Sequence, residues 1–213
     1  MHAATRRVFL GDWGRVVRDP IDLLRLVFVA GSVWFAVNGD IHGMSNLLVA
    51  TVGVLGARAL DLPRLYDLGF CVAMIFTGWG EALGLYDLIS WYDNLVHFCV
   101  PLLSAQVAYI ALARVEVLPD LHDRTGTHRD AGIFVVTFAL GVAIGGLWEI
   151  LEWSSDNLFA SNLQLSNDDT VGDLIADSSG SAVGAALLVC WGRFGWGSVR
   201  RIPGENRYED TDA

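Results

Sequence analysis

Residues 131–148 read AGIFVVTFALGVAIGGLW, eighteen consecutive residues without a charged side chain. A helix that crosses the apolar layer of a bilayer needs about 20 predominantly apolar residues, so a few neighbouring residues complete the span. Glu149 follows this run directly and therefore falls at the edge of the predicted membrane layer. The stretch predicts a transmembrane helix over residues 131–153.

Five other stretches have the same apolar character, and the composition of the whole chain agrees with them. Hydrophobic residues make up 53% of the 213 residues and charged residues 18%, whereas soluble domains carry about a quarter charged residues. We therefore expect an all-α, polytopic membrane bundle of about six transmembrane helices, formed by residues 21–193. The other five helices are predicted near 21–38, 41–59, 66–84, 91–113 and 174–193.

The fourteen basic residues, all of them arginine, predict how this bundle lies in the membrane. Some arginines precede or begin the first predicted helix, and others follow the last one. The rest lie in two connections, one between the second and third helices and one between the fourth and fifth. Basic residues concentrate in cytoplasmic loops. We therefore expect a multi-pass protein of the cell (inner) membrane, with a cytoplasmic N-terminal segment over residues 1–20 and a cytoplasmic polar tail over residues 194–213.

The net charge and the absence of known motifs exclude several classes of function. A net charge of −10 argues against nucleic-acid binding, because such binding needs a basic surface that neutralises phosphates. No phosphate-binding loop, nucleophile elbow, dinucleotide fingerprint or His-Glu-x-x-His pattern is present in the sequence. Cys71, Cys99 and Cys190 all lie within apolar runs and are expected to be core residues. The bilayer is the partner that the sequence indicates.

A group of acidic residues lies on the predicted side of the membrane that carries none of the arginines. Like charges without a counter-charge raise each other's pKa, so such a group requires protons, a bound cation or open water. Eleven of the 24 carboxylates fall at the predicted outer ends, namely Asp40, Glu81, Asp87, Asp93, Glu149, Glu152, Asp156, Asp168, Asp169, Asp173 and Asp177.

Three predicted helices carry these groups at helical spacing. The three faces are Asp93 with His97; Glu149 with Glu152 and Asp156; and Asp169 with Asp173 and Asp177. Each face continues inward as small residues, among them Gly141, Gly145, Gly180 and Gly184, and small residues at this spacing let membrane helices approach closely. The carboxylates are therefore expected to point into seams between helices.

Carboxylates with one imidazole suit a divalent cation such as Mg²⁺, Mn²⁺, Ca²⁺ or Zn²⁺. We expect Glu149 and Asp173 to be essential to the site, also as catalytic residues if the protein is an enzyme. Three further residues, His42, Glu81 and Tyr86, would either extend the site or serve the local structure. The expected ligands are Asp93, His97, Glu149, Glu152, Asp173 and Asp177.

Two other interpretations remain open at this point. The protein could be a proton or cation transporter or channel in which the same carboxylates form a relay, because ionisable groups inside a membrane are costly to keep. They could also be solvated helix ends and caps of a structural membrane protein, since acids at a helix N-terminus meet its positive dipole.

Three motifs resemble the YjdF-like family of inner-membrane proteins over roughly residues 60–192. Residues 91–98, WYDNLVHF, resemble its Asp-x-x-x-His-Phe motif; residues 148–153, WEILEW, its Tyr-Glu-x-x-Glu-Trp segment; and residues 169–177, DTVGDLIAD, its Asp-Thr-x-x-Asp-x-x-x-Asp segment. The order of these motifs is also similar to that of the broader VanZ-like proteins.

This resemblance implies a helical membrane fold and the same site residues. Through the VanZ-like proteins it also implies lipid or cell-envelope chemistry. If the protein is an enzyme, the predicted metal site favours metal-dependent hydrolysis or transfer on a lipid-linked substrate. One departure is that the sequence has no basic residue between the acidic helix and the last helix, where VanZ-like proteins usually carry one.

Overall fold

The structure is a computed structural model that describes residues 20–60, 62–121, 126–159, 163 and 166–194. Within these ranges it is all-helical, which confirms the all-α part of the prediction. The predicted segments 1–20 and 194–213 lie outside the described residues, apart from Pro20 and Phe194. The elements are α2 (Pro20–Val37), α3 (Ile41–Ala59), α4 (Arg64–Met74), the π-helix η1 (Ile75–Trp79), α5 (Gly80–Ala82), α6 (Leu85–Leu88), α7 (Tyr92–Arg114), α8 (Arg129–Phe159) and α9 (Asn167–Phe194).

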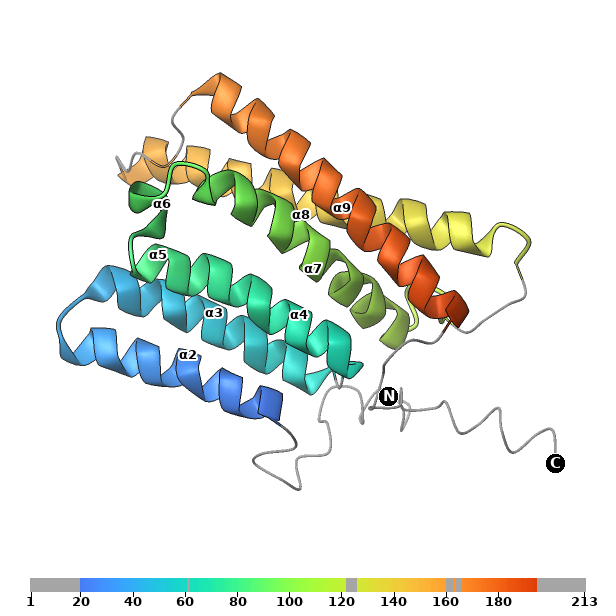
Figure 1. Cartoon of the computed structure of the whole chain (residues 1–213), viewed down its shortest axis with the longest axis horizontal. Coiled ribbons are helices and arrows are strands. Elements are labelled where there is room, and N and C mark those ends of the chain that lie inside the picture. Colours follow the sequence, from blue (N-terminus) through green and yellow to red (C-terminus); the bar gives the residue numbers. More distant parts are fainter. Residues whose placement is uncertain (1–19, 61, 122–125, 160–162, 164–165, 195–213) are drawn as a thin grey trace.

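A helix forms at each of the six predicted places, and the long helices run side by side along one direction (Figure 1). Among the described residues, α7, α8 and α9 are long and apolar enough to cross a membrane. The protein is therefore a helical membrane protein, while the count of six spans and the orientation of the termini stay predictions. Many large apolar side chains on α2, α3 and α8 are exposed, for example Val49 and Val135, as expected of surfaces that face lipid.

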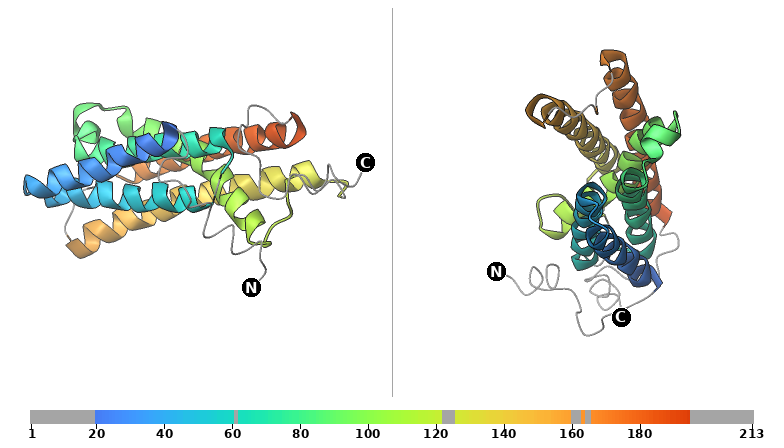
Figure 2. Two further views of the ribbon diagram at one scale, coloured as in Figure 1. Left: turned by 90° about the horizontal axis from the view of Figure 1, so that it is seen from below. Right: turned by 90° about the vertical axis from the view of Figure 1, so that its left-hand side faces the viewer.

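Helices α2, α3 and α4 pack against one another at one side of the molecule (Figures 1 and 2). A short turn joins α2 to α3, in which Gly39 has φ +77°, a conformation that glycine adopts at little cost. The Asp40 side chain then accepts a hydrogen bond from the Gly43 amide at 2.9 Å and caps α3. Phe28, Leu47, Val54 and Cys71 are fully buried between these helices.

Helices α7, α8 and α9 form the other half, and glycines set their spacing. A Cβ at Gly180 would collide with the carbonyl oxygen of Phe98, and one at Gly184 would lie 2.7 Å from the carbonyl oxygen of Leu102. These contacts hold α9 directly against α7 with the two helices running in the same direction. The predicted role of the small residues is confirmed at both positions, and the close packing brings the acidic faces of the helices together.

Two boundaries differ from the prediction by more than two residues. Helix α9 begins at Asn167, seven residues before the expected start at 174, because the Ser166 hydroxyl accepts a hydrogen bond from the Asp169 amide at 3.1 Å and caps the helix. Helix α8 continues to Phe159, six residues beyond the expected end at 153. Asp169 and Asp173 therefore both lie within a regular helix.

Candidate functional site

The site centres on the imidazole of His97, which the first two turns of α7 place against α8 and α9. Its Nδ1 lies 3.2 Å from Asp177 Oδ1 on α9, within hydrogen-bond distance. Its Nε2 lies 3.5 Å from Asp93 Oδ1 and 3.7 Å from Glu149 Oε1 on α8. Three helices thus direct carboxylates at one buried histidine. We call Asp93, His97, Glu149, Asp173 and Asp177 the acidic cluster.

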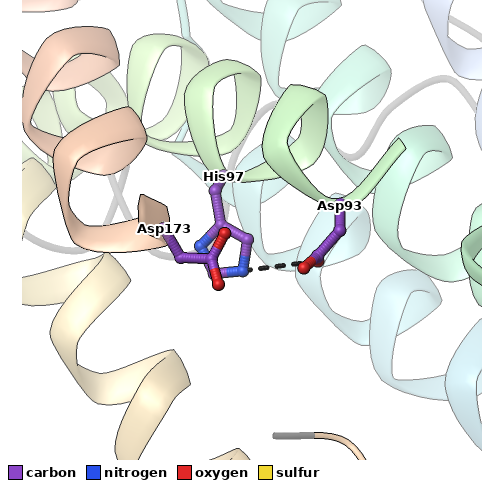
Figure 3. Close-up of side chains that lie close together, drawn as sticks. All are labelled: Asp93, His97 and Asp173. Atoms are coloured by element: carbon purple, nitrogen blue, oxygen red, sulfur yellow. Dashed lines mark ion pairs between the residues drawn. The ribbon is translucent and has the colours of Figure 1, made fainter. Parts of the chain in front are cut away.

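Asp173 lies one turn before Asp177 on α9 and completes this group. Figure 3 shows its carboxylate beside the His97 ring. One ligand atom from each of Asp93, His97 and Asp173 lies within 4.8 Å of the others. Atoms that bind one ion at about 2.0–2.6 Å can lie at most about 5 Å apart. The three side chains are therefore close enough to share a cation.

Several carboxylate oxygens of the acidic cluster are buried without a hydrogen-bond partner among the described residues. Asp177 Oδ2 and both oxygens of Glu149 have no described partner with full hydrogen-bond geometry. Glu149 Oε1 does lie 3.7 Å from His97 Nε2, and the Thr170 hydroxyl approaches the same carboxylate. The exposed fractions of Asp177 and Glu149 are 1% and 6%. Burying a charged group costs free energy unless the group is paired or binds a metal. A bound proton or cation would therefore stabilise these oxygens.

No described arginine offsets these charges, because every one of them belongs to the opposite ends of the helices. The acidic cluster lies near the start of α7 and α9 and in the second half of α8. The described arginines are Arg25 at the start of α2, Arg58 at the end of α3, Arg64 at the start of α4, Arg114 at the end of α7, Arg129 at the start of α8 and Arg193 at the end of α9.

Glu152 lies at the rim of the acidic cluster rather than within it. One of its carboxylate oxygens accepts a hydrogen bond from the indole N–H of Trp148 at 2.7 Å. Asp156, one turn further along α8, accepts a hydrogen bond from the Leu163 amide at 2.9 Å and serves the α8–α9 connection. Of the acidic face predicted on α8, Glu149 alone reaches His97 within 4 Å.

His42 is placed apart from His97. Its Nε2 lies 2.8 Å from Glu81 Oε1, and its side chain is 68% exposed. Glu81 thus pairs with His42 on the surface formed by α3 and α5. The structure does not make His42 a second imidazole of the acidic cluster.

Tyr86 approaches the rim of the acidic cluster from α6. Its ring packs edge-on against Tyr92, with ring centroids 5.1 Å apart. Burial, and then the charges of Asp93 and Glu81, raise the pKa of the Tyr86 phenol. This hydroxyl therefore stays protonated and is a hydrogen-bond donor beside a group of acceptors.

Ser181 is a residue of the site that the sequence analysis did not single out. Its side chain is fully buried, and its hydroxyl donates to the Asp177 carbonyl oxygen at 2.6 Å. The signal was its position four residues after Asp177, which puts both on one face of α9. Gly141 faces this serine across the α8–α9 seam.

With this geometry established, comparison with known proteins identifies the family. Residues 21–193 match the family described as predicted membrane protein (DUF2238), and the chain belongs to that family. This is the YjdF family, so the resemblance seen in the motifs is confirmed at that level.

Comparison with individual proteins finds a further likeness. The chain is 31% identical over 120 residues to an uncharacterised protein of Thermotoga maritima. The aligned region covers 55% of this chain and 58% of that relative. No solved structure matches the chain.

Proposed function

We propose that this protein binds a divalent cation in the acidic cluster, on the extracytoplasmic side of the membrane. The observation that carries the proposal is the set of buried oxygens of Glu149 and Asp177 that lack a hydrogen-bond partner among the described residues, around a histidine. A cation would neutralise these oxygens together. Oxygen ligands with one imidazole suit Mg²⁺, Mn²⁺, Ca²⁺ or Zn²⁺.

Three residues would form the first contacts with the ion. Asp93, His97 and Asp173 already offer atoms within 4.8 Å of one another, and Glu149 and Asp177 would complete the coordination after small side-chain rotations. Glu152 is part of the proposal only as an outer group, because its carboxylate binds Trp148.

A lipid-linked or cell-envelope substrate fits such an ion best. No described arginine lies at this end of the helices, so a phosphate-bearing substrate would be held through the cation. A bound cation polarises such a group or activates a water molecule, which makes hydrolysis or transfer the proposed chemistry. The likeness of the motifs to VanZ-like proteins supports the same class of substrate.

Metal analysis of the full chain in detergent tests this proposal. Wild type is compared with Glu149→Gln, Asp173→Asn and the control Asp168→Asn, an exposed acid in the first turn of α9. We expect about one ion per chain in wild type and in the control, and at least a tenfold weaker affinity in the other two variants, because each loses a charged ligand.

The histidine is tested with Mn²⁺ as the probe. Electron spin echo measurements on the Mn²⁺-loaded wild type should detect coupling to an imidazole nitrogen, and His97→Gln should lose it while His42→Gln keeps it. Equal ion content in all variants contradicts the proposal. So does the absence of an ion from every protein after addition of divalent cations.

A second candidate function, a proton relay, is favoured by polar side chains deeper in the bundle. Ser104, Gln106 and Thr137 are buried on the inner halves of α7 and α8, and each has a polar atom without a hydrogen-bond partner among the described residues. They would continue a path from Asp177 through Ser181 toward the other side. If no ion binds, proton flux through vesicles containing the protein is the measurement that decides for this relay.

A further inference from the structure

A second charged site lies at the opposite end of α8 and α9 from the acidic cluster. It is a pocket of about 630 Å³ between the start of α8, the residues just before it and the end of α9. We call it the basic pocket. Its lining residues are Gly126, Thr127, His128, Arg129, Asp130, Ala131, Gly192, Arg193 and Phe194.

Arg129 has buried hydrogen-bond donors in this pocket that no described residue satisfies. Its side chain is 13% exposed, and its Nη1 lies 3.1 Å from Asp130 Oδ1. Its Nε and Nη2 atoms are buried and have no hydrogen-bond partner among the residues that the structure describes. A buried donor of a charged group is costly to leave unpaired, so an acceptor is expected beside this guanidinium.

The charge balance of the basic pocket indicates that this acceptor is an anion. Asp130 binds both Arg129 and the Nε of Arg193, so among the lining residues one carboxylate is shared between two arginines and a positive charge remains. His128 lies in the same lining. The first turn of α8 also faces the pocket, and the N-terminus of a helix favours anions through its free N–H groups and dipole.

The planar guanidinium of arginine matches the oxygens of a phosphate group with two parallel hydrogen bonds. We propose that the basic pocket binds a phosphate-bearing anion, held by Arg129 and Arg193 at the N-terminus of α8. The pocket lies at the end of two membrane-spanning helices, and Phe194 beside it is an exposed apolar side chain. Both features favour the headgroup of an anionic phospholipid over a soluble phosphate, because basic pockets between membrane helices bind such headgroups.

The experiment uses the full chain in detergent micelles and two probes. Phosphatidylglycerol, in competition with phosphatidylcholine, is counted on the protein by native mass spectrometry, and inorganic phosphate is titrated by calorimetry. The variants are Arg129→Gln and Arg193→Gln, with Arg64→Gln as a control. Arg64 begins α4, at the same end of the bundle and outside the pocket.

We expect wild type and Arg64→Gln to retain phosphatidylglycerol preferentially, and each pocket variant to lose at least tenfold in affinity, since each removes charge-assisted hydrogen bonds. Binding should also weaken as salt is raised. If inorganic phosphate binds with the same dependence on the variants and the lipid does not, the pocket takes a soluble phosphate compound.

Two results overturn the proposal: no binding of either probe to wild type, or equal losses in the pocket variants and in Arg64→Gln. Arg193 is 60% exposed, so Arg193→Gln is expected to fold and keeps the test valid even if Arg129→Gln is unstable. The acidic cluster serves as an internal control, because its ion content should be unchanged in all three arginine variants.

Discussion

Gly145 allows the Asp177 carboxylate to reach His97. A Cβ at this position of α8 would overlap both Asp177 Oδ2 and its Cγ, so the carboxylate occupies the space that any other residue would fill. On its other side Asp177 Oδ1 meets His97 Nδ1 at 3.2 Å. The absence of a side chain on α8 therefore fixes the position of an acidic group on α9.

Gly145→Ala should consequently affect both stability and ion binding. The added methyl group must push Asp177 aside or separate α8 from α9, and overpacking of this kind costs about 1–3 kcal/mol. The thermal midpoint in detergent and the affinity for Mn²⁺ measure the two effects. Gly146→Ala is the matched control, because a Cβ at Gly146 meets nothing within 4 Å. Equal behaviour of the two variants would contradict this account of the seam.

Among the elements, α2, α3 and α4 are joined by buried charges. The Nη1 of Arg25 on α2 lies 2.7 Å from Asp22 Oδ1, and its Nη2 contacts Asp67 on α4. The Nε of Arg58 on α3 also lies 3.0 Å from Asp22 Oδ1. All four side chains are buried. These four side chains carry two positive and two negative charges, and their contacts hold the three helices in register.

Replacing Arg25 alone should reduce the stability of the protein much more than replacing Arg25 and Asp67 together. Arg25→Gln removes a positive partner from both Asp22 and Asp67, and breaking a buried ion pair costs about 3–5 kcal/mol. The double variant Arg25→Met with Asp67→Leu should recover most of this loss, because Asp22 keeps Arg58. Unfolding midpoints in a denaturing detergent series measure both. A double variant as unstable as Arg25→Gln would refute the pairing.

At the scale of the whole molecule, the helices and the convergence of three acidic faces could be predicted from the sequence. Apolar runs such as 131–148 define where a helix can cross a membrane, and the four-residue spacing of Asp93 with His97 and of Asp173 with Asp177 defines shared faces. These features are local to one helix. The helix positions and the shared faces are therefore the same in any packing of the bundle that places the small residues between the helices.

The remaining details depend on how the helices are rotated and where their ends are capped, which no single segment specifies. Glu152 shares a face with Glu149, yet it binds Trp148 on its own helix. His42 meets Glu81 because the Gly39 turn and α5 bring them together. The basic pocket likewise could not be predicted, since Arg129 and Arg193 are 64 residues apart in the sequence and meet only through the packing of α8 on α9.

The orientation of the molecule in the membrane decides which side the acidic cluster and the basic pocket face. Cysteine labelling tests this orientation. The distribution of arginines predicts that the acidic cluster faces outward and the basic pocket faces the cytoplasm. In a chain whose three native cysteines are replaced, Asp87→Cys in α6 and Thr127→Cys before α8 both occupy exposed positions. A membrane-impermeant maleimide added to intact cells should label Asp87→Cys at once and Thr127→Cys only after the membrane is permeabilised. The reverse pattern would put the acidic cluster in the cytoplasm, where an envelope substrate could not reach it, and labelling of both positions in intact cells would contradict a span formed by α8.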